Sequence, residues 1–404
     1  MPTIVDFPTI VKDAVDICGD LFANEPERRH CAEYLTGLMV AAKKPVSGIH
    51  GALVVTTDQA CLNRWLNEVT WDVQALNDRR LAWLQGDPKT RYSPRGVIAI
   101  DNTLVDHAGK LIEDVGWFGD HAHERYVIAH DSLSSNDVCP SGAPYPMAWR
   151  RFKKQDVCQK GECTDPTALC MERSDDASTR DIPGDFPFDS YCTSARVLNH
   201  MQHTTRAYVG ELKLNRKLVY DGREQSLQAV ARQIPWQAKK PVRVGNRRYW
   251  YCSKQMRIPD VTHPIRIVLF WKERDHAEAS KALVSKRLLG EVSRMVLVYR
   301  HRWTGTETLH RDGKQALGLG DCQVRHGAGQ TRHVYLVSGA YSLLMRSLHQ
   351  SRPQDWARTL LTTIGEACRA VKGELLEQLV DWIVDKLADA QWSIPQIKAV
   401  LAHT

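Results

Sequence analysis

The spacing of hydrophobic and polar residues divides the chain into two helical ends and a β-containing middle. Over residues 1–90, stretches such as PTIVKDAVDICGDLF and PERRHCAEYLTGLMVAA repeat apolar residues at helical intervals. A further helical stretch begins near Thr57 or Asp58, either of which can cap its N-terminus. Residues 351–404 read as amphipathic helix. We therefore expect an N-terminal helical domain, for DNA binding or dimerisation, and a C-terminal helical tail.

Between these ends the hydrophobic pattern changes to that of strands. Apolar runs in RGVIAID, ERYVIAHDSL, YPMAWRRFKK, FPFDS and AYVGELK predict buried strands. The first run is expected to end at Asp101 and the fourth to deliver Asp189, with a helix from about Thr193. Residues 157–187 are predicted to be loop-rich, and the chain from about 276 onward mostly helical.

The predicted fold class is therefore α/β. Its mixed core covers residues 91–215 and 276–350, and a basic β-rich insertion at 216–275 interrupts it. The length of 404 residues agrees with more than one domain.

Charge changes this picture because it is unevenly distributed. Residues 206–332 hold 26 Lys+Arg and 11 Asp+Glu, a balance of +15, whereas the whole chain carries only +7. A basic segment of this size is typical of a protein that binds a polyanion, with nucleic acid the first candidate. A solvated basic surface is the alternative.

Composition also indicates the compartment. No run of 18 apolar residues exists, and the N-terminus lacks an apolar signal-peptide region. The 11 cysteines are irregularly spaced, which favours free thiols in a reducing cytoplasm over a disulfide framework.

Three acids are candidates for chemistry. Asp101 and Asp189 follow apolar strand runs, and Glu307 lies among bases, with Arg300, Arg311 and Lys314 on its face of a predicted helix. Converging carboxylates can hold divalent cations such as Mg²⁺, and surrounding bases can hold a polyanionic substrate. The alternatives are turn or cap residues for the aspartates and surface ion pairs for the glutamate.

These residues resemble the DDE transposases of the IS4/IS701-like insertion-sequence group. GVIAIDNTLVDHAGK resembles the first-aspartate strand of that family, and FPFDSYCTSARVLNHMQHTTRAYVGELKLNR resembles the second-aspartate strand with its following helix and strand. YRHRWTGTETLHRDGKQALGL resembles the Tyr-x2-Arg-x3-Glu-x6-Lys motif, and DQACLNRWLNEVTWD resembles the helical region. Two departures are visible: Asn102 stands where a second Asp is usual, and four residues separate Arg302 from Glu307.

The resemblance implies an RNase H-like core in which Asp101, Asp189 and Glu307 ligate two Mg²⁺ ions, which Mn²⁺ can replace. Tyr299, Arg302 and Lys314 would contact the DNA of the element ends. The implied activity is cleavage at terminal inverted repeats, followed by attack of the freed 3′-OH on target DNA. The implied assembly is a homodimer on double-stranded DNA in a bacterial cytoplasm, associated with the nucleoid. A β-rich insertion is expected between Asp189 and Glu307, where 117 residues are present.

The insertion is a further candidate DNA surface. Its bases are interleaved with aromatics and suit phosphate contacts, which position DNA without reading its sequence; they are Lys239, Lys240, Arg243, Arg247, Arg248 and Lys254. By the resemblance, Trp236 or Trp250 could stack on a flipped base, whereas packing within the insertion is the alternative.

Two weaker metal patterns are also present. Cys158, Cys163 and Cys170, with Cys139 upstream, could bind zinc, although their spacing lacks paired C-x2-C units. The sequence GDHAHER brings His121 and His123 close to Asp120, where a polar turn is the alternative. Two further functions stay open: a nuclease that cuts without joining, and a decayed DNA-binding protein.

Overall fold

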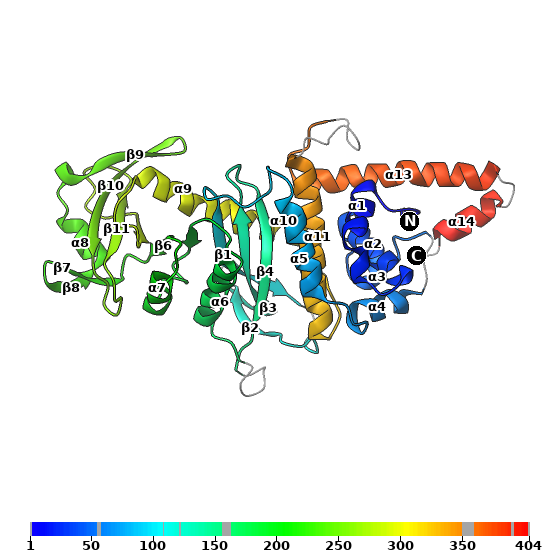
Figure 1. Ribbon diagram of the computed structural model, residues 1–404, viewed down its shortest axis with the longest axis horizontal. Coiled ribbons are helices and arrows are strands. Elements are labelled where there is room, and N and C mark those ends of the chain that lie inside the picture. The colour runs from blue at the N-terminus through cyan, green and yellow to red at the C-terminus, as the bar shows by residue number, and fades with distance from the viewer. Residues whose placement is uncertain are drawn as a thin grey trace.

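The computed structural model describes residues 2–54, 58–107, 109–120, 123–155, 163–349, 359–388 and 392–402. The fold is mixed α/β, as predicted, and its parts follow one another along the long axis of the molecule (Figure 1). The β-rich insertion lies at one end, strands β1–β4 lie in the middle, and the N-terminal helices lie at the other end with α13 and α14.

The N-terminal segment is helical, as the sequence predicts. Its helices are α1 (Thr9–Cys18), α2 (Glu25–Val40), α3 (Val46–His50), α4 (Gln59–Asn67) and α5 (Val73–Gln85), with a short 3-10 turn at Gly19–Leu21. The Asp58 side chain caps α4 by accepting from the Ala60 N–H at 3.3 Å; Thr57 lies outside the described residues. These helices share one apolar core with α11 (Gly327–His349) and the first half of α13 (Ile364–Ala388).

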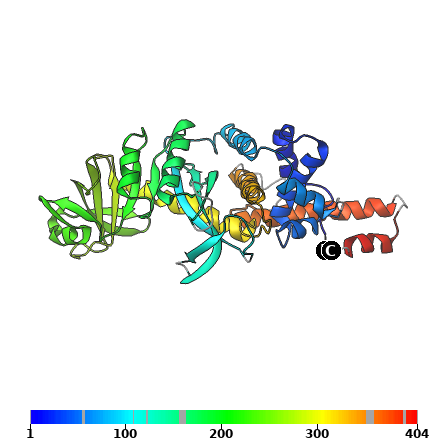
Figure 2. The same ribbon diagram turned by 90° about the horizontal axis from the view of Figure 1, so that it is seen from below.

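The long helix α13 lies beside α2 and continues past the N-terminal helices, and α14 (Ile394–Ala402) follows it (Figures 1 and 2). The helical tail was therefore predicted correctly within the described residues. None of the helices in these ranges has the length and apolar character needed to cross a membrane.

The middle of the molecule is built on β1 (Val97–Asp106), β2 (Gly116–Asp120), β3 (Arg125–Val138) and β4 (Pro144–Phe152). β3 pairs antiparallel with β1 on one side and with β2 and β4 on the other. The predicted strand at VIAI is present, but it continues through Asp106, so Asp101 lies within the strand and not at its end.

A second sheet joins the first through a parallel bridge between Val97 and Asp185. It contains, in spatial order, β5 (Phe186–Phe188), β6 (Tyr208–Leu212), β12 (Lys281–Ser285), β11 (Ile265–Trp271), β10 (Arg247–Met256) and β9 (Lys240–Val244). β5 and β6 are parallel. The bridge between the two sheets places the strands of the core in the order β4-β3-β1-β5-β6, and the strands of the insertion extend this order. β12 corrects the prediction of helix from about 276.

Helices cover both faces of the strands. α9 (Val292–Arg302) packs on β1, β5, β6 and β9, so one helix spans the core and the insertion. It continues through the π-turn η3 (Trp303–Glu307) into α10 (Thr308–Ala316). The other face carries α7 (Ala195–Gln202) and, in the insertion, α8 (Leu227–Gln233). The insertion also has a 3-10 turn at Trp236–Ala238 and a separate pair of strands, β7 (Lys217–Tyr220) and β8 (Arg223–Ser226).

A helix between the core strands and Asp189 was missed by the sequence prediction. α6 (Pro166–Thr179) lies in the stretch expected to be loop-rich. Asp165 caps it by accepting from the Thr167 N–H at 3.0 Å, and Pro166 occupies its first turn.

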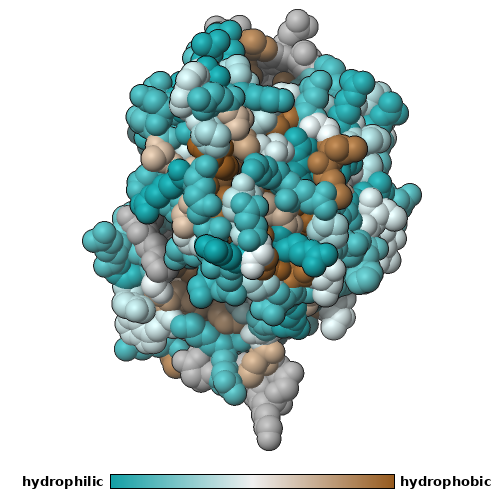
Figure 3. Space-filling view, turned by 90° about the vertical axis from the view of Figure 1, so that its left-hand side faces the viewer, coloured by the Kyte–Doolittle hydropathy of each residue, from teal (hydrophilic) through white to brown (hydrophobic). Residues whose placement is uncertain are grey.

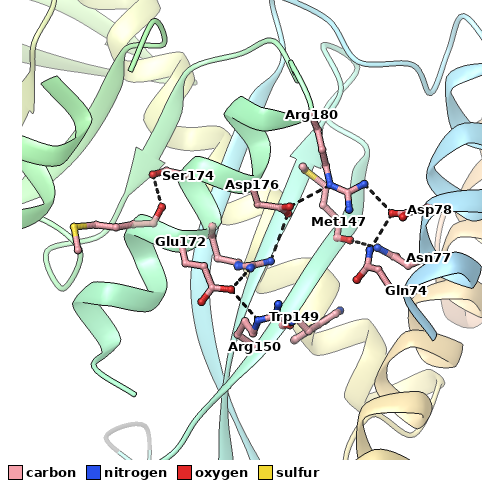
Figure 4. A network of polar contacts seen from close by, with 12 residues as sticks. Gln74, Asn77, Asp78, Met147, Trp149, Arg150, Glu172, Ser174, Asp176 and Arg180 are labelled. Carbon is pink, nitrogen blue, oxygen red and sulfur yellow. Dashed lines mark hydrogen bonds and ion pairs between the residues drawn. The ribbon is translucent and has the colours of Figure 1, made fainter. Parts of the chain in front are cut away.

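Polar contacts attach α6 and β4 to the N-terminal segment (Figure 4). Arg180 Nη1 lies 2.8 Å from Asp78 of α5, and the Asn77 side chain donates to the Met147 carbonyl of β4 at 2.8 Å. On the other side of this network, Arg150 of β4 pairs with Glu172 of α6 at 2.9 Å. These contacts fix the core sheet relative to the helical end.

Candidate active site: a carboxylate centre beside a basic hairpin

Asp101 is the most enclosed of the three predicted acids. It lies on β1 and is 9% exposed. Its Oδ2 is 2.5 Å from Arg302 Nη1 and 3.2 Å from Thr306 Oγ1, and its Oδ1 accepts from the Asn102 N–H at 3.1 Å. Both oxygens of the carboxylate therefore have protein partners.

Asp189 follows β5 directly, as the sequence predicts. Its Oδ1 accepts from the N–H groups of Tyr191 at 2.9 Å and Cys192 at 3.2 Å, so the residue also stabilises the turn that leads into α7. Its other oxygen, Oδ2, has no hydrogen-bond partner within the described residues. Asp189 thus has one oxygen for the turn and one for a ligand.

Glu307 is the last residue of the π-turn and is exposed. Across the described ranges its side chain forms no ion pair or hydrogen bond. The π-turn accounts for the spacing that departs from the family pattern. In a regular α-helix, five residues would rotate Glu307 by roughly 140° away from Arg302. A π-turn has more residues per turn, which returns Glu307 toward the face of Arg302.

Electrostatics connect the three acids through Asp101 and Arg302. Burial raises the pKa of Asp101 to about 7; Arg302 and Thr306 oppose this rise, and the carboxylates of Asp189 and Glu307 add to it. Burial alone would lower the pKa of Arg302, but the same three carboxylates contribute to raising it. Arg302 is therefore a positive charge that contacts Asp101 and interacts with the charges of Asp189 and Glu307.

This arrangement also bears on metal binding. In the described part of the chain, no group of three or more His, Cys, Asp or Glu side chains is placed so that it could hold a metal ion. At this site Arg302 and Thr306 contact Asp101, and the turn occupies one oxygen of Asp189. The donor type, carboxylate oxygen, suits Mg²⁺. The residues therefore fit the ion in kind, provided that Arg302 moves.

A glycine allows the Glu307 segment to approach the sheet. A Cβ placed on Gly305 would lie 2.3 Å from Val138 Cγ2 and 3.1 Å from Ala99 Cβ. Only a residue without a side chain lets the π-turn contact β1 and β3 so closely.

A buried polar layer lies behind Asp101 and was not singled out from the sequence. Ser134 Oγ is 2.8 Å from His310 Nε2 and 3.4 Å from the Asp101 carbonyl oxygen, and Asn136 donates to Ser134 at 2.9 Å. Burial lowers the pKa of His310 to about 3, so its imidazole is neutral. The only sequence signal for this layer is the run of polar residues, HDSLSSND, within an otherwise apolar strand context.

The predicted DNA-binding bases of the insertion differ in exposure, and Lys254 is half-buried with its Nζ donating to the Tyr220 hydroxyl. Lys240, Arg243, Arg247 and Arg248 lie exposed on the β9–β10 hairpin, defined here as residues 240–256, and within the described ranges they form no ion pair. Lys239 was predicted wrongly as a surface contact: it is 3% exposed, and its Nζ donates to the His276 carbonyl at 2.6 Å.

The hairpin carries its positive charge without local acids. Arg243 and Arg248 are direct cross-strand partners, a placement in which like charges destabilise a sheet. No Asp or Glu occurs anywhere in residues 225–259. The end of the molecule that carries the insertion is largely hydrophilic (Figure 3).

The two tryptophans of the insertion are linked by an arginine. The Arg274 guanidinium lies 4.6 Å from the Trp236 ring centroid and 4.9 Å from that of Trp250. Arg248 lies 5.7 Å from the Trp250 ring. Trp236 is 52% exposed. Base stacking on either ring stays a prediction.

The bases of α9 and α10 lead from the hairpin toward Glu307. A groove of about 440 Å³ lies between the insertion sheet and α9, and residues lining it include Tyr249, Lys272, Lys281, Tyr299, Arg300 and Trp303. Arg300 reaches the hairpin tip, where a Cβ on Gly245 would lie 3.8 Å from its Nη1. Tyr299 is buried and donates its hydroxyl proton to Glu211.

The remaining predicted DNA contacts lie on α10. Arg311 pairs with the neighbouring Asp312 at 3.0 Å. Burial lowers the pKa of the Lys314 amine, opposed by the carboxylates of Asp106, Asp120 and Glu307. The roles of Tyr299, Arg300, Arg311 and Lys314 in DNA binding stay predictions.

The alternative metal patterns gain no support. Cys139 and Cys170 are buried in the core, Cys163 is exposed, and Cys158 lies outside the described residues. His123 pairs with Asp120 at 2.7 Å in a polar turn, and His121 likewise lies outside the described residues.

Comparison with known proteins finds no family model that matches the chain and no match among curated proteins. The functional argument therefore depends on the site itself.

Proposed function

We propose that this protein is a DDE-type transposase, which cuts DNA at the ends of an insertion element and joins the freed 3′-OH to target DNA. One observation carries the proposal: Asp101, Asp189 and Glu307 come from three separate elements, and the charges of all three act on a single buried cation, Arg302, which contacts Asp101 at 2.5 Å. In this proposal the strands β4-β3-β1-β5-β6, covered by helices, form an RNase H-like core.

The three carboxylates would hold the metal. Two bound Mg²⁺ ions would supply activation of the attacking oxygen and stabilisation of the departing 3′ oxygen. Glu307 and the second oxygen of Asp189 have no competing partner among the described residues, so they are the first ligands a cation would meet. The catalytic chemistry needs no serine or tyrosine nucleophile.

The β9–β10 hairpin would bind the DNA. Its exposed, unpaired bases suit phosphate contacts, which fix the position of a duplex without specifying sequence. α9 and the groove beside it connect the hairpin to the π-turn that carries Glu307. A duplex bound on the hairpin would therefore have a path to the carboxylate centre along positively charged residues.

The proposal is tested by cleavage of duplexes made from the DNA that borders the protein's own coding sequence. We expect Mg²⁺-dependent cutting by the wild-type protein, and loss of cutting with retained DNA binding in D101N, D189N and E307Q. A variant that keeps full cleavage removes its residue from the site. The absence of any metal-dependent cutting by the wild type would favour the DNA-binding alternative.

A nuclease without strand transfer is the second candidate, because the same carboxylate centre would serve it. A pre-cleaved element end with a free 3′-OH distinguishes the two. A transposase joins this end to a target plasmid, whereas a nuclease leaves it unjoined.

The proposed homodimer has a candidate surface in the outer half of α13. Exposed apolar residues recur there on one helix face, namely Leu376, Val380, Val384 and Leu387. Two copies could pair through this face, and the molar mass in solution, measured with and without DNA, tests it.

A further inference from the structure

The contact between Arg302 and Asp101 does more than connect α9 to β1. Arg302 is 6% exposed, and its Nη1 lies 2.5 Å from Asp101 Oδ2. A buried ion pair is retained only when its partners satisfy each other, because each charge alone is costly to bury. Asp189 and Glu307 lie near the same guanidinium. Arg302 thus occupies Oδ2 of Asp101, an oxygen that a metal ion would otherwise find available.

The surroundings of Arg302 also allow its guanidinium to take a second position. Its Nε makes no hydrogen bond within the described residues. The guanidinium lies 5.0 Å from the Trp303 ring centroid and 5.9 Å from that of Tyr299. Both aromatic residues line the groove between α9 and the insertion sheet. A guanidinium that leaves Asp101 can therefore turn toward this groove, where a DNA phosphate would offer it a bidentate partner.

We infer that Arg302 is an internal counter-cation that competes with divalent metal for Asp101 and is transferred to a DNA phosphate when metal binds. The inference rests on the proposed metal centre but goes beyond it, because it assigns a coupling between two ligands. Without DNA, Arg302 holds the carboxylates together and keeps metal affinity low. With DNA, the phosphate draws Arg302 away and the metal takes its place. By linkage, metal must then strengthen DNA binding by the same factor.

The affinity of the full chain for Mn²⁺ without DNA, measured by titration calorimetry, tests this inference. R302Q removes the competing charge and should bind Mn²⁺ roughly tenfold or more tightly than wild type, since an opposite charge this close strongly alters a carboxylate's affinity for cations. R294Q is the matched control. Arg294 lies on the same helix about two turns earlier, and its guanidinium donates to the Arg95 carbonyl at 3.2 Å. Its loss removes the same charge and should leave Mn²⁺ affinity within about twofold of wild type.

R302Q leaves Asp101 without its partner and could be unstable without metal. Thermal unfolding across a Mn²⁺ series then gives the same answer, because a ligand that binds only the folded state stabilises it. Half-maximal stabilisation should occur at about tenfold lower Mn²⁺ in R302Q than in wild type.

D101N separates failure of this inference from failure of the proposed function. If D101N loses Mn²⁺ binding while R302Q binds no more tightly than wild type, the metal centre stands and the counter-cation role of Arg302 is overturned. If neither wild type nor R302Q binds Mn²⁺, the proposed metal centre fails and the inference fails with it. Added duplex should raise the Mn²⁺ affinity of wild type more than that of R302Q, and an equal rise in both would also overturn it.

Discussion

The carboxylate centre and the β9–β10 hairpin treat charge in opposite ways. In the centre, Asp101 is buried and Arg302 balances it at 2.5 Å. On the hairpin, Arg243 and Arg248 face each other across two strands, exposed and without an acidic partner in the described ranges. A buried charge must be compensated by the protein itself, whereas an exposed like-charge pair is tolerable in water and improves when a polyanion arrives.

The hairpin has a second explanation that does not involve DNA. β9 is an edge strand, and charged residues on an edge prevent pairing with another chain. Under that explanation the bases would need no partner. Removing charge from each region in turn therefore distinguishes a DNA-binding role of the hairpin from edge protection.

The largest effect is expected at the centre. D189N keeps the size of the side chain and its bond to the turn but removes the charge of a carboxylate that has one oxygen left for a ligand. We expect DNA cleavage to fall by a factor on the order of 1000 or more, since a two-metal site contributes several kcal/mol to the rate. DNA affinity, measured by fluorescence anisotropy, should stay unchanged. A large loss of affinity would show that the centre and the hairpin do not act separately.

A third region, in which a charge is buried without a counter-ion, sharpens the comparison. Asp137 on β3 is 1% exposed, and its Oδ1 has no hydrogen-bond partner among the described residues. Burial raises its pKa to about 7, although a hydrogen bond from the Cys139 thiol opposes the rise. Nothing in the described structure compensates this carboxylate as Arg302 compensates Asp101.

The sign of the resulting pH dependence follows from linkage. Because the folded-state pKa of Asp137 lies above its ordinary value of 3.8, the folded protein binds a proton that the unfolded chain lacks between these values. The associated stability is complete below about pH 4 and is lost as pH rises through about 7. Between pH 5 and pH 8, wild type should lose about 2–3 kcal/mol relative to D137N. Urea unfolding of both proteins across this range measures it, and a constant difference would refute the assignment.

The next largest effect is expected on the β9–β10 hairpin. R243Q/R248Q should weaken duplex binding by about 10- to 100-fold at low salt and reduce the slope of log affinity against log salt by about two. Stability should not fall, because the substitution relieves a like-charge pair. The matched control is R79Q, since Arg79 is paired with Asp20 at 2.8 Å in the N-terminal segment. If both proteins bind DNA as wild type does, the edge-protection explanation is the correct one.

Much of the sheet could be predicted from apolar runs, because strands such as β1, β4 and β6 each begin with a buried, mostly apolar run. The end of β1 could not be placed, since Asp101 looks like a boundary while antiparallel pairing with β3 continues to Asp106. α6 was missed because its residues are mostly polar and its signal is only the Asp165–Pro166 cap.

The candidate site shows the same limit. The three acids were recognised through resemblance to a family motif, not through their periodicity. The contact of Arg302 with Asp101 joins residues 201 positions apart, and no local pattern reports such a pair. The π-turn was likewise invisible, because its residues differ little from those of an ordinary helix and the turn is stabilised by contacts with the sheet.

The smallest expected effect tests whether the π-turn only accommodates one additional residue in the helix or itself positions Glu307. Deleting Thr304, which is exposed, would shorten the spacing between Arg302 and Glu307 to that of the family motif and let the helix close with regular α-helical bonds. Gly305 would keep its place against Val138, so the approach to the sheet is retained. We expect the free energy of unfolding to change by less than about 1 kcal/mol, and Mn²⁺ affinity to stay within about threefold of wild type. Insertion of one alanine after Thr304 is the matched control, because it would turn Glu307 away from Arg302 and should abolish the Mn²⁺ binding that the deletion preserves. If the deletion also abolishes binding, the π-turn itself positions Glu307, and the carboxylate centre depends on a local geometry that no motif spacing describes.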